Sequence, residues 1–551
     1  MRRVSGIAEF LGFSKQFIPP IFTKVSLAGS KLPESEWIPP GVIAPLSVLQ
    51  RGTPSRQSGR ISLRVFSDSK MDALPPFDQL NSEMKPPTTH QADSRRNFLR
   101  KAVAAAATVQ IVPRHVIGGP GFVAPSETVY IALVGAGGMG IANARKLFAH
   151  GDARIVAVAD PAESHLKEGN RERQGRQPAI QQIEAHYSQT IPDFRCAEYE
   201  DFRVLLEKEK GIDAVLCATP DHLHAWASVL AMRAGKHLYC EKPLAHNLRE
   251  TRLVAEVAGE TGVATQMGNQ GTAEDGIRET IECLRSGAVG TVREIHCWVG
   301  AGRYGADLLG RPGPPQEVPE GLNWDLWLGP REWRDFHPAY HPFSWRDFWP
   351  FGNGALGDFG CHELNAPTWA YDLPLPTRVT AHAAGLTNDE IVPPGAIAHY
   401  EFPGEGERPA MRLTWYDGGL KPAVPEALGD LELPRRGALY IGDRGVVLTH
   451  GSGTGPRIFP DELASSAPLP KPSLPRSDGH QREWLDACKG GPKAGSHFDR
   501  AAHLTEIVQL GILALRTGKS IEWNATKLEA SGLPEAEPLI HGSYRNGWEL
   551  I

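Results

Sequence analysis

Two patterns of hydrophobic and polar residues divide the chain. Between residues 129 and 267, short apolar runs alternate with segments whose apolar positions recur at helical spacing. A continuous apolar run is typical of a strand buried on both faces of a parallel sheet. We therefore predict an α/β domain with a doubly wound parallel sheet. Its expected strands are 129–134, 154–160, 212–218, 237–240 and 263–267, and its expected helices are 141–148, 202–209, 223–234 and 248–259.

The pattern changes from Val292 onward. Short strand-like segments are separated by loops rich in glycine and proline, which favours a second α/β domain with a largely antiparallel sheet. These segments are 292–299, 378–382, 397–402, 411–416, 438–441 and 445–449, with helices expected at 356–370, 479–488 and 499–516. Residues 300–323 form a long irregular loop, which we interpret as a lid or as a contact between subunits.

A glycine-rich turn, residues 135–140 (GAGGMG), joins the first strand to the first helix. The first glycine permits the tight turn, the second lets a pyrophosphate approach the backbone, and the third packs the helix on the strand. The helix N-terminus supplies N–H groups to the phosphates. Asp160 ends the second strand, where a carboxylate accepts hydrogen bonds from ribose hydroxyls and repels a 2′-phosphate. The pattern predicts NAD in preference to NADP, bound by Gly135, Gly137, Gly138, Met139, Gly140 and Asp160.

Further polar residues follow the later strands. Residues 219–224 (TPDHLH) follow the third strand, 241–243 (EKP) the fourth, and Asn269 the fifth. Because the carboxyl ends of parallel strands share one edge of a sheet, this edge is where ligands bind. We expect the cofactor site to include Thr219, Pro220, His224, Glu241, Lys242 and Asn269. His222 and His224 could also be metal ligands, but a cofactor-side or capping role is favoured, and no metal is predicted.

A second group of candidate residues lies between 352 and 365. Asp358 and His362 are four residues apart, so a helix over 356–370 places them on one face. There the carboxylate can orient the imidazole and raise its basicity; a plain surface pair is the alternative. Six tryptophans lie nearby, and we weigh packing equally with platforms for sugar rings. They are Trp324, Trp327, Trp333, Trp345, Trp349 and Trp369.

The N-terminal region is interpreted as lying outside the folded domains. Residues 1–93 are rich in proline, serine and arginine, and we expect them to be disordered or to reflect an over-extended start site. Residues 94–126 begin with Arg95-Arg96 before an alanine-rich stretch, which resembles a bacterial twin-arginine signal. We expect periplasmic export through that machinery, or a cytoplasmic location if the signal is not used. The folded domains are then 127–268, which binds NAD, and 269–551, for substrate and oligomer contacts, with the final helices packing back.

Composition excludes several classes of function. A formal net charge of −6 argues against a broadly basic nucleic-acid binder. Seven cysteines without C-x-x-C spacing argue against a zinc site or a disulfide framework. No apolar run approaches the ~20 residues of a membrane span. With 41% hydrophobic and 22% charged residues, the chain is typical of a globular protein with a large core.

Four motifs in this order resemble the glucose–fructose oxidoreductase / inositol dehydrogenase (Gfo/Idh/MocA) family. They are GAGGMG (135–140), TPDHLH (219–224), CEKPL (240–244) and GALGDFGCH (354–362). The resemblance covers residues 127–550 and looks closest to an exported, tryptophan-rich branch, with WYDGGLKP (415–422) and a terminal YRNGW (544–548). It implies a Rossmann domain followed by an α/β domain whose open sheet carries substrate specificity and subunit contacts, and hence a homo-oligomer.

The same resemblance implies site residues. Lys242, Asp358 and His362 match the family's catalytic trio, and the Lys242–Pro243 bond is expected to be cis. The position after the catalytic histidine that is often acidic in the family is Asn365 here.

These observations predict an NAD-dependent oxidoreductase that acts on a CH–OH group of a sugar, polyol or glycoside. His362 would take the hydroxyl proton, Lys242 would stabilise the developing alkoxide, and Asp358 would orient the trio. Lys242 receives the electrostatic role because a lysine ammonium ordinarily keeps its proton at neutral pH. The alternative is a glycoside-processing lyase or hydrolase that uses tightly bound NAD in an oxidation, elimination, addition and reduction cycle. A non-catalytic sugar-binding protein would not require Lys242 and His362.

Overall fold

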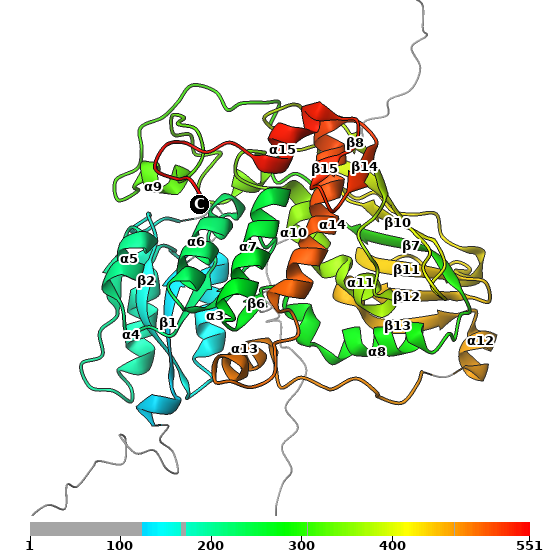
Figure 1. Ribbon diagram of the computed structural model, residues 1–551, viewed down its shortest axis with the longest axis horizontal. Helices are drawn as coiled ribbons and strands as arrows, with labels where there is room; N and C mark the ends of the chain where they lie inside the picture. Colours follow the sequence, from blue (N-terminus) through cyan, green and yellow to red (C-terminus); the bar gives the residue numbers. More distant parts are fainter. Residues whose placement is uncertain (1–123, 167–171, 306, 468, 551) are drawn as a thin grey trace, which may run out of the picture. The chain divides into compact units, whose positions relative to one another are not determined.

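The computed structural model describes residues 124–166, 172–305, 307–467 and 469–550 (Figure 1). These residues all belong to the unit Arg100–Ile551. The interpretations of residues 1–93 as an extension and of residues 94–123 as an export signal concern positions outside the described residues. Within the described part, no helix is long and apolar enough to cross a membrane.

The first domain is built on a six-stranded parallel sheet, which confirms the predicted doubly wound fold (Figure 1). The strand order is β3-β2-β1-β4-β5-β6, and the order reverses between β1 and β4, where α/β sheets bind ligands. The strands are β1 (Val129–Val134), β2 (Ala153–Ala159), β3 (Ala197–Tyr199), β4 (Ala214–Cys217), β5 (His237–Cys240) and β6 (Thr265–Met267). The helices are α3 (Gly138–Leu147), α4 (Arg176–Tyr187), α5 (Phe202–Lys208), α6 (Asp221–Arg233) and α7 (Leu248–Thr261).

The continuous apolar run in β1 has a direct structural cause. Ile131 and Leu133 pack in one hydrophobic cluster with residues of α3 and α4. Ala132 and Val134, which point to the other face, pack in a second cluster with residues of α5, α6 and α7. Because helices cover both faces of the sheet, neither set of alternating positions can be polar.

The second domain contains a nine-stranded mixed sheet in the order β13-β12-β11-β7-β10-β9-β8-β14-β15. Its described pairs are antiparallel except for β7 with β10, which agrees with the predicted largely antiparallel sheet. The strands are β7 (Val292–Val299), β8 (Arg378–Ala384), β9 (Gly395–Phe402), β10 (Met411–Tyr416), β11 (Arg436–Gly442), β12 (Val446–His450), β13 (Thr454–Phe459), β14 (Ile521–Asn524) and β15 (Glu529–Ala530).

The helices of the second domain include one correction. The predicted single helix over 356–370 is wrong, because it is two helices, α10 (Gly354–Glu363) and α11 (Asn365–Tyr371). Pro367 has no N–H to continue the hydrogen-bond ladder from α10 and is tolerated only in a first helical turn. Asp358 and His362 both remain in α10. The other helices are α8 (Asp275–Arg285), α9 (Trp324–Leu328), α12 (Asp461–Ser466), α13 (His480–Cys488), α14 (Phe498–Thr517) and α15 (Glu537–His541).

Two segments distant in sequence return to the first domain. Trp484 and Leu485 of α13 join the hydrophobic cluster that contains Ile131 and Leu133. The indole of Trp484 makes an edge contact with the buried ring of Tyr239 in β5, at 5.5 Å between ring centroids. At the C-terminus, the Trp226 Nε1–H of α6 donates to the carbonyl of Trp548 (2.9 Å). The first domain is therefore completed by residues from the end of the chain.

Residues 319–346, which we call the strap, cross from the second domain to the end of β2. The Asn323 N–H donates to the carbonyl of Pro161 (2.9 Å), and the Glu163 N–H donates to the carbonyl of Gly321 (2.7 Å). Arg545 near the C-terminus donates to the carboxylate of Asp325 (2.6 Å). The irregular loop predicted at 300–323 thus ends in a backbone pairing with the first domain.

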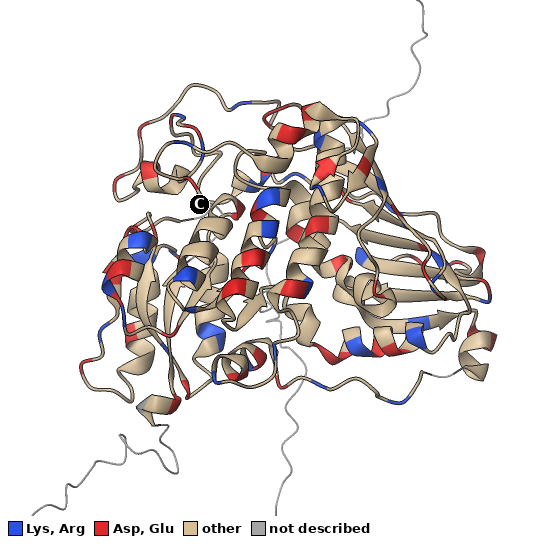
Figure 2. Cartoon of the chain, viewed as in Figure 1, with Lys and Arg blue, Asp and Glu red and all other residues tan. Residues whose placement is uncertain are grey.

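Charged side chains of both signs are interspersed on the helices seen in Figure 2. Along α8, for example, the exposed charged residues are Asp275, Glu279 and Arg285. Charges of mixed sign along a helix are typical of a solvated surface.

Candidate active site

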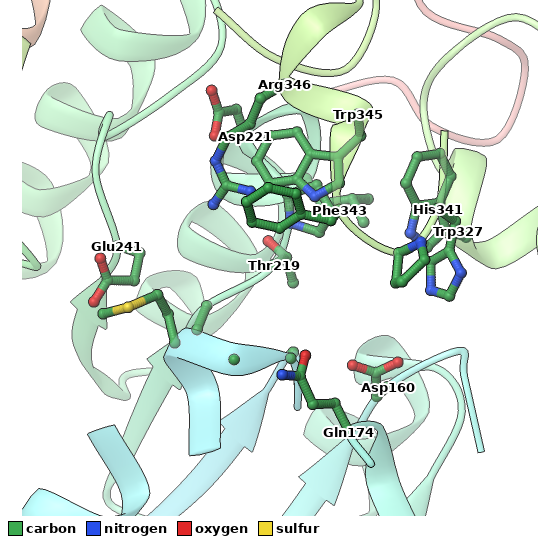
Figure 3. A pocket seen from close by; sticks show the side chains of 18 of the residues that line it. Asp160, Gln174, Thr219, Asp221, Glu241, Trp327, His341, Phe343, Trp345 and Arg346 are labelled. Atoms are coloured by element: carbon green, nitrogen blue, oxygen red, sulfur yellow. The ribbon is translucent and has the colours of Figure 1, made fainter. Parts of the chain in front are cut away.

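The carboxyl ends of the first domain's strands and the strap enclose a cavity of about 330 Å³. Figure 3 shows Asp160 and Gln174 on the wall formed by the first domain, and Phe343, Trp345 and Arg346 on the wall formed by the strap. Ten of the predicted cofactor residues line it: Gly135, Gly137, Gly138, Met139, Asp160, Thr219, Pro220, His224, Glu241 and Lys242. The two that do not line it are Gly140 and Asn269.

The glycine-rich turn leaves room for a ligand at its backbone. Gly135 has a φ of +89°, and a Cβ on it would lie 2.6 Å from the carbonyl carbon of Ala218. A Cβ on Gly140 would lie 2.0 Å from the carbonyl oxygen of Gly135, so this glycine packs α3 against β1. A Cβ on Gly137 would meet no atom within 4 Å. Gly137 therefore presents open backbone to the cavity, as a pyrophosphate requires.

Asp160 stands at the end of β2 and holds the turn in place. Its two carboxylate oxygens accept hydrogen bonds from the Ala136 N–H (2.7 Å) and the Ala162 N–H (2.8 Å). Burial raises the pKa of Asp160, and these backbone donors act in the opposite direction. A carboxylate oxygen has more than one lone pair, so Asp160 can still accept from hydroxyl groups of a ligand in the cavity.

Glu241, in the turn after β5, accepts hydrogen bonds through only one of its two carboxylate oxygens among the described residues. Its Oε1 accepts from the Asn143 side-chain amide (2.8 Å) and from that of Gln270 (2.9 Å). Its Oε2 is buried and has no partner among the described residues. A buried carboxylate oxygen without a donor is costly, and a ligand donor in the cavity would relieve that cost. Together with Asp160 and the open glycine turn, this oxygen fits a bound NAD.

Asn269 lies away from the cavity. Its side-chain amide donates to the carbonyl of Cys361 in α10 (3.2 Å), and its oxygen accepts from the Ser496 hydroxyl. The end of β6 is thereby tied to α10. The structure thus places Asn269 in a contact between the two domains instead of in the cavity wall.

His224 links the two turns that carry Thr219 and Lys242. Its Nδ1 lies 2.7 Å from the carbonyl oxygen of Pro243, and its Nε2 lies 2.9 Å from that of Thr219. Cys217 and Cys240 bring their sulfurs near the same ring, with all three ligand atoms within 4.8 Å of one another. Because both ring nitrogens face carbonyl oxygens, neither is available to a metal in this arrangement. The geometry favours a bridging role for His224.

Lys242 connects the cavity to the second domain. The Lys242–Pro243 bond is cis, as expected. The ammonium donates to the carbonyl oxygen of Asp358 (2.7 Å) and to its carboxylate. The Tyr304 hydroxyl also donates to this carboxylate. Burial would raise the pKa of Asp358, but Lys242 and Arg346 beside it hold that pKa below its ordinary value.

His362 lies one helical turn after Asp358 and is partly buried. Among the described residues it makes no hydrogen bond to either Lys242 or Asp358. Burial, followed by the positive charges of Lys242 and Arg436, lowers the pKa of His362 well below its ordinary value. The expected rise in basicity from Asp358 is therefore outweighed. The imidazole is neutral at neutral pH and can accept a proton. Neither His362 nor Asp358 lines the cavity; Lys242 does.

Several residues near the cavity had no periodic signal in the sequence. Tyr304 and Arg346 come from irregular segments, and only the local density of aromatic residues pointed to this region. Trp327 and Trp345 line the cavity and also pack with Trp324 in one buried hydrophobic cluster. Trp349 is buried as well, and Trp333 is exposed. Asn365 is buried and donates to the Thr272 hydroxyl (2.8 Å).

The cavity at the glycine-rich turn has the open backbone and the acidic groups that bound NAD requires, and comparison with known proteins agrees. Residues 129–269 match the model of an oxidoreductase family with an NAD-binding Rossmann fold, and residues 307–392 match that of its C-terminal alpha/beta domain. Over these residues the chain is similar to the Gfo/Idh/MocA oxidoreductase family.

Curated relatives in this family match over part of their length. The scyllo-inositol 2-dehydrogenase (NAD(+)) of Bacillus subtilis is 33% identical over 25% of this chain and 35% of its own. The 2,7-anhydro-N-acetylneuraminate hydratase of Mediterraneibacter gnavus is 26% identical over 31% of this chain and 39% of its own. The chain therefore matches less than half the length of either relative.

A solved structure shows the same fold. The WlbA dehydrogenase from Bordetella pertussis, in complex with NADH and UDP-GlcNAcA, superposes with a TM-score of 0.50 at 16% identity. The match covers 72% of this chain and 99% of that one.

Proposed function

We propose that the protein is an NAD-dependent oxidoreductase that acts on a CH–OH group of a sugar or polyol. The observation that carries the proposal is the contact between Lys242, which lines the cofactor cavity, and Asp358 of the second domain. It places a cation held by a buried carboxylate beside the cavity. The inositol dehydrogenases among the relatives support a polyhydroxylated substrate.

In this proposal each residue has a defined task. NAD bound along the glycine-rich turn supplies the hydride acceptor. The neutral imidazole of His362 accepts the hydroxyl proton of the substrate. The Lys242 ammonium stabilises negative charge that develops on the substrate oxygen, and Asp358 positions that ammonium. Tyr304 fixes the Asp358 carboxylate from the opposite side.

Replacing Lys242 with methionine tests the assignment, because methionine keeps the length of the side chain without its charge. We expect K242M to lose turnover on a panel of sugars and polyols, measured as NADH absorbance, and to retain NAD binding, measured by calorimetry. K519M, at an exposed position at the end of α14, is the control and should behave as the wild type. Turnover in K242M would refute the assignment.

A second candidate is a redox-neutral lyase or hydrolase that acts on glycosides with a retained NAD. The strap favours it, because its backbone pairing at Pro161, Glu163, Gly321 and Asn323 fastens it beside Asp160. A hydratase among the relatives is consistent with redox-neutral chemistry. Mass spectrometry of the native protein should find NAD at about one per chain. Glycosides such as p-nitrophenyl glucoside should then release product without accumulation of NADH. Protein purified without NAD would contradict this candidate.

We also propose export and self-association. Export rests on the Arg95-Arg96 motif alone. Replacing both arginines with lysine should keep the protein in the cytoplasm, as measured by fractionation.

Self-association rests on the nine-stranded sheet, where polar and aromatic side chains such as His382 and His399 contact each other. Light scattering coupled to gel filtration should report a mass above that of one chain.

A further inference from the structure

Arg346 is a cation in the cavity wall with no hydrogen-bond acceptor of its own. It lies at the end of the strap in a short 3-10 helix, Ser344–Asp347, and Figure 3 shows it in the cavity wall. Lys242 lines the same cavity. Its guanidinium lies over the indole of Trp345, 4.1 Å from the ring centroid, and 5.5 Å from the ring of Phe343. It makes no hydrogen bond to another residue in the described part of the chain. Its side chain is 20% exposed.

The acid nearest to Arg346 is already engaged. The Arg346 Nε lies 3.6 Å from the Asp358 carboxylate, which is too long for a hydrogen bond. That carboxylate accepts from Lys242 and Tyr304 instead. Arg346 therefore has an acid within ion-pair range but no hydrogen bond to it.

Other arginines of the same region differ in this respect. Arg334 donates to Glu390 and to the Tyr340 hydroxyl, and Arg331 donates to Glu250. Arg311, which is 78% exposed, donates to Glu390. Each of these pairs places the guanidinium against a carboxylate of the protein. Of these four arginines, only Arg346 lines the cavity, and it makes no hydrogen bond to a carboxylate among the described residues.

We propose that Arg346 binds a carboxylate of the substrate, so that the substrates of this protein are carboxylated sugars such as uronic acids and their glycosides. A guanidinium stacked on an indole keeps its edge free, and that edge matches a carboxylate with two parallel hydrogen bonds. A phosphate dianion would meet Asp358 and Asp221 nearby, and the glycine-rich turn already provides the phosphate site of the cofactor. The inference rests on the proposed function and specifies its substrate.

Matched pairs of sugars test the proposal. Each pair consists of a methyl hexoside and the corresponding methyl hexuronide, in the gluco, galacto and manno series. Binding to the NAD-loaded protein is measured by calorimetry and turnover by NADH absorbance. In at least one series we expect the acid to exceed the neutral sugar by about ten- to a hundredfold in affinity and in kcat/KM, as one charge-assisted contact provides.

Variants assign the preference to Arg346. R346M should lower the ratio of kcat/KM for the acid to kcat/KM for the neutral sugar to near one, mainly through KM. R346K should retain an intermediate ratio, because a lysine offers one contact to the carboxylate instead of two. R311M, which removes an arginine outside the cavity, is the control and should keep the wild-type ratio. The R346K variant preserves the positive charge beside Asp358, so it remains informative if R346M does not fold.

The outcomes separate this inference from the proposed function. Preferential binding of the acid, dependent on Arg346 but without turnover, supports the inference and contradicts the oxidoreductase function. Turnover without acid preference contradicts the inference only. A wild-type ratio near one in every series, or a ratio unchanged in R346M, overturns it. Loss of NAD affinity in R346M with the sugar ratio unchanged would assign Arg346 to the cofactor phosphates and also overturn it.

Discussion

Replacing Asp358 with asparagine removes one charge of the buried pair and leaves the Lys242 ammonium without its counter-ion. The side chains of Lys242 and Asp358 are 11% and 14% exposed. At this degree of burial, loss of one partner costs about 3–5 kcal/mol, because the remaining charge stays buried and uncompensated. We expect D358N to lose about 3 kcal/mol of unfolding free energy, since the amide oxygen still accepts one hydrogen bond.

Urea denaturation followed by tryptophan fluorescence measures this loss of unfolding free energy. A double-mutant cycle shows how much of the loss comes from the interaction between Lys242 and Asp358. K242M removes the charge that D358N leaves uncompensated, so the double variant should lose less than the sum of the single losses, by more than about 1 kcal/mol. E522Q is the matched control, because the Arg378–Glu522 pair is about half exposed and should contribute less than about 1 kcal/mol. Additive losses within about 0.5 kcal/mol would refute a coupled buried pair.

Four further outcomes follow from the structure. Burial lowers the pKa of His222, His341 and His480 to about 3. Because these histidines have higher pKa values in the unfolded chain, that chain binds more protons below pH 6.5, and the free energy of unfolding falls as pH decreases. Each contributes a loss of about 1.4 kcal/mol at pH 5.5, which urea titrations at pH 5.5 and 7.5 would detect; equal stability would contradict it. G140A should abolish NAD binding, because its Cβ would overlap the Gly135 carbonyl oxygen. D160A should weaken NAD binding and reduce the preference over NADP, as measured by calorimetry with both cofactors. R545A should accelerate NAD release, measured by stopped-flow fluorescence, and an unchanged rate would show that Asp325 does not hold the strap.

The parallel sheet was predictable because both its faces are covered. Its strands β1, β2, β4 and β5 read as continuous apolar runs, and each ends in residues with recognisable chemistry. β3 and α4 were not predicted, since β3 is three partly exposed residues and the α4 sequence combines a proline with several glutamines. Their formation depends on packing against β2 instead of on local pattern.

The candidate site was predictable only where it follows strand ends. The glycine-rich turn, Asp160 and Lys242 lie at one sheet edge by topology. Tyr304 and Arg346 reach the site through irregular backbone, where no periodicity constrains position. The lowering of the pKa of His362 was also not predictable, because it depends on burial and on Arg436, which is distant in sequence.

The contact of Trp484 with Tyr239 affects how the protein can be made. Residues 127–268 emerge from the ribosome first and contain every strand of the parallel sheet. The buried face beside Tyr239 is nevertheless covered by Trp484 and Leu485, more than two hundred residues later. A fragment that stops at residue 268 would expose that apolar surface to water. The NAD-binding domain is contiguous in sequence, but its folding is complete only after α13 has been synthesised.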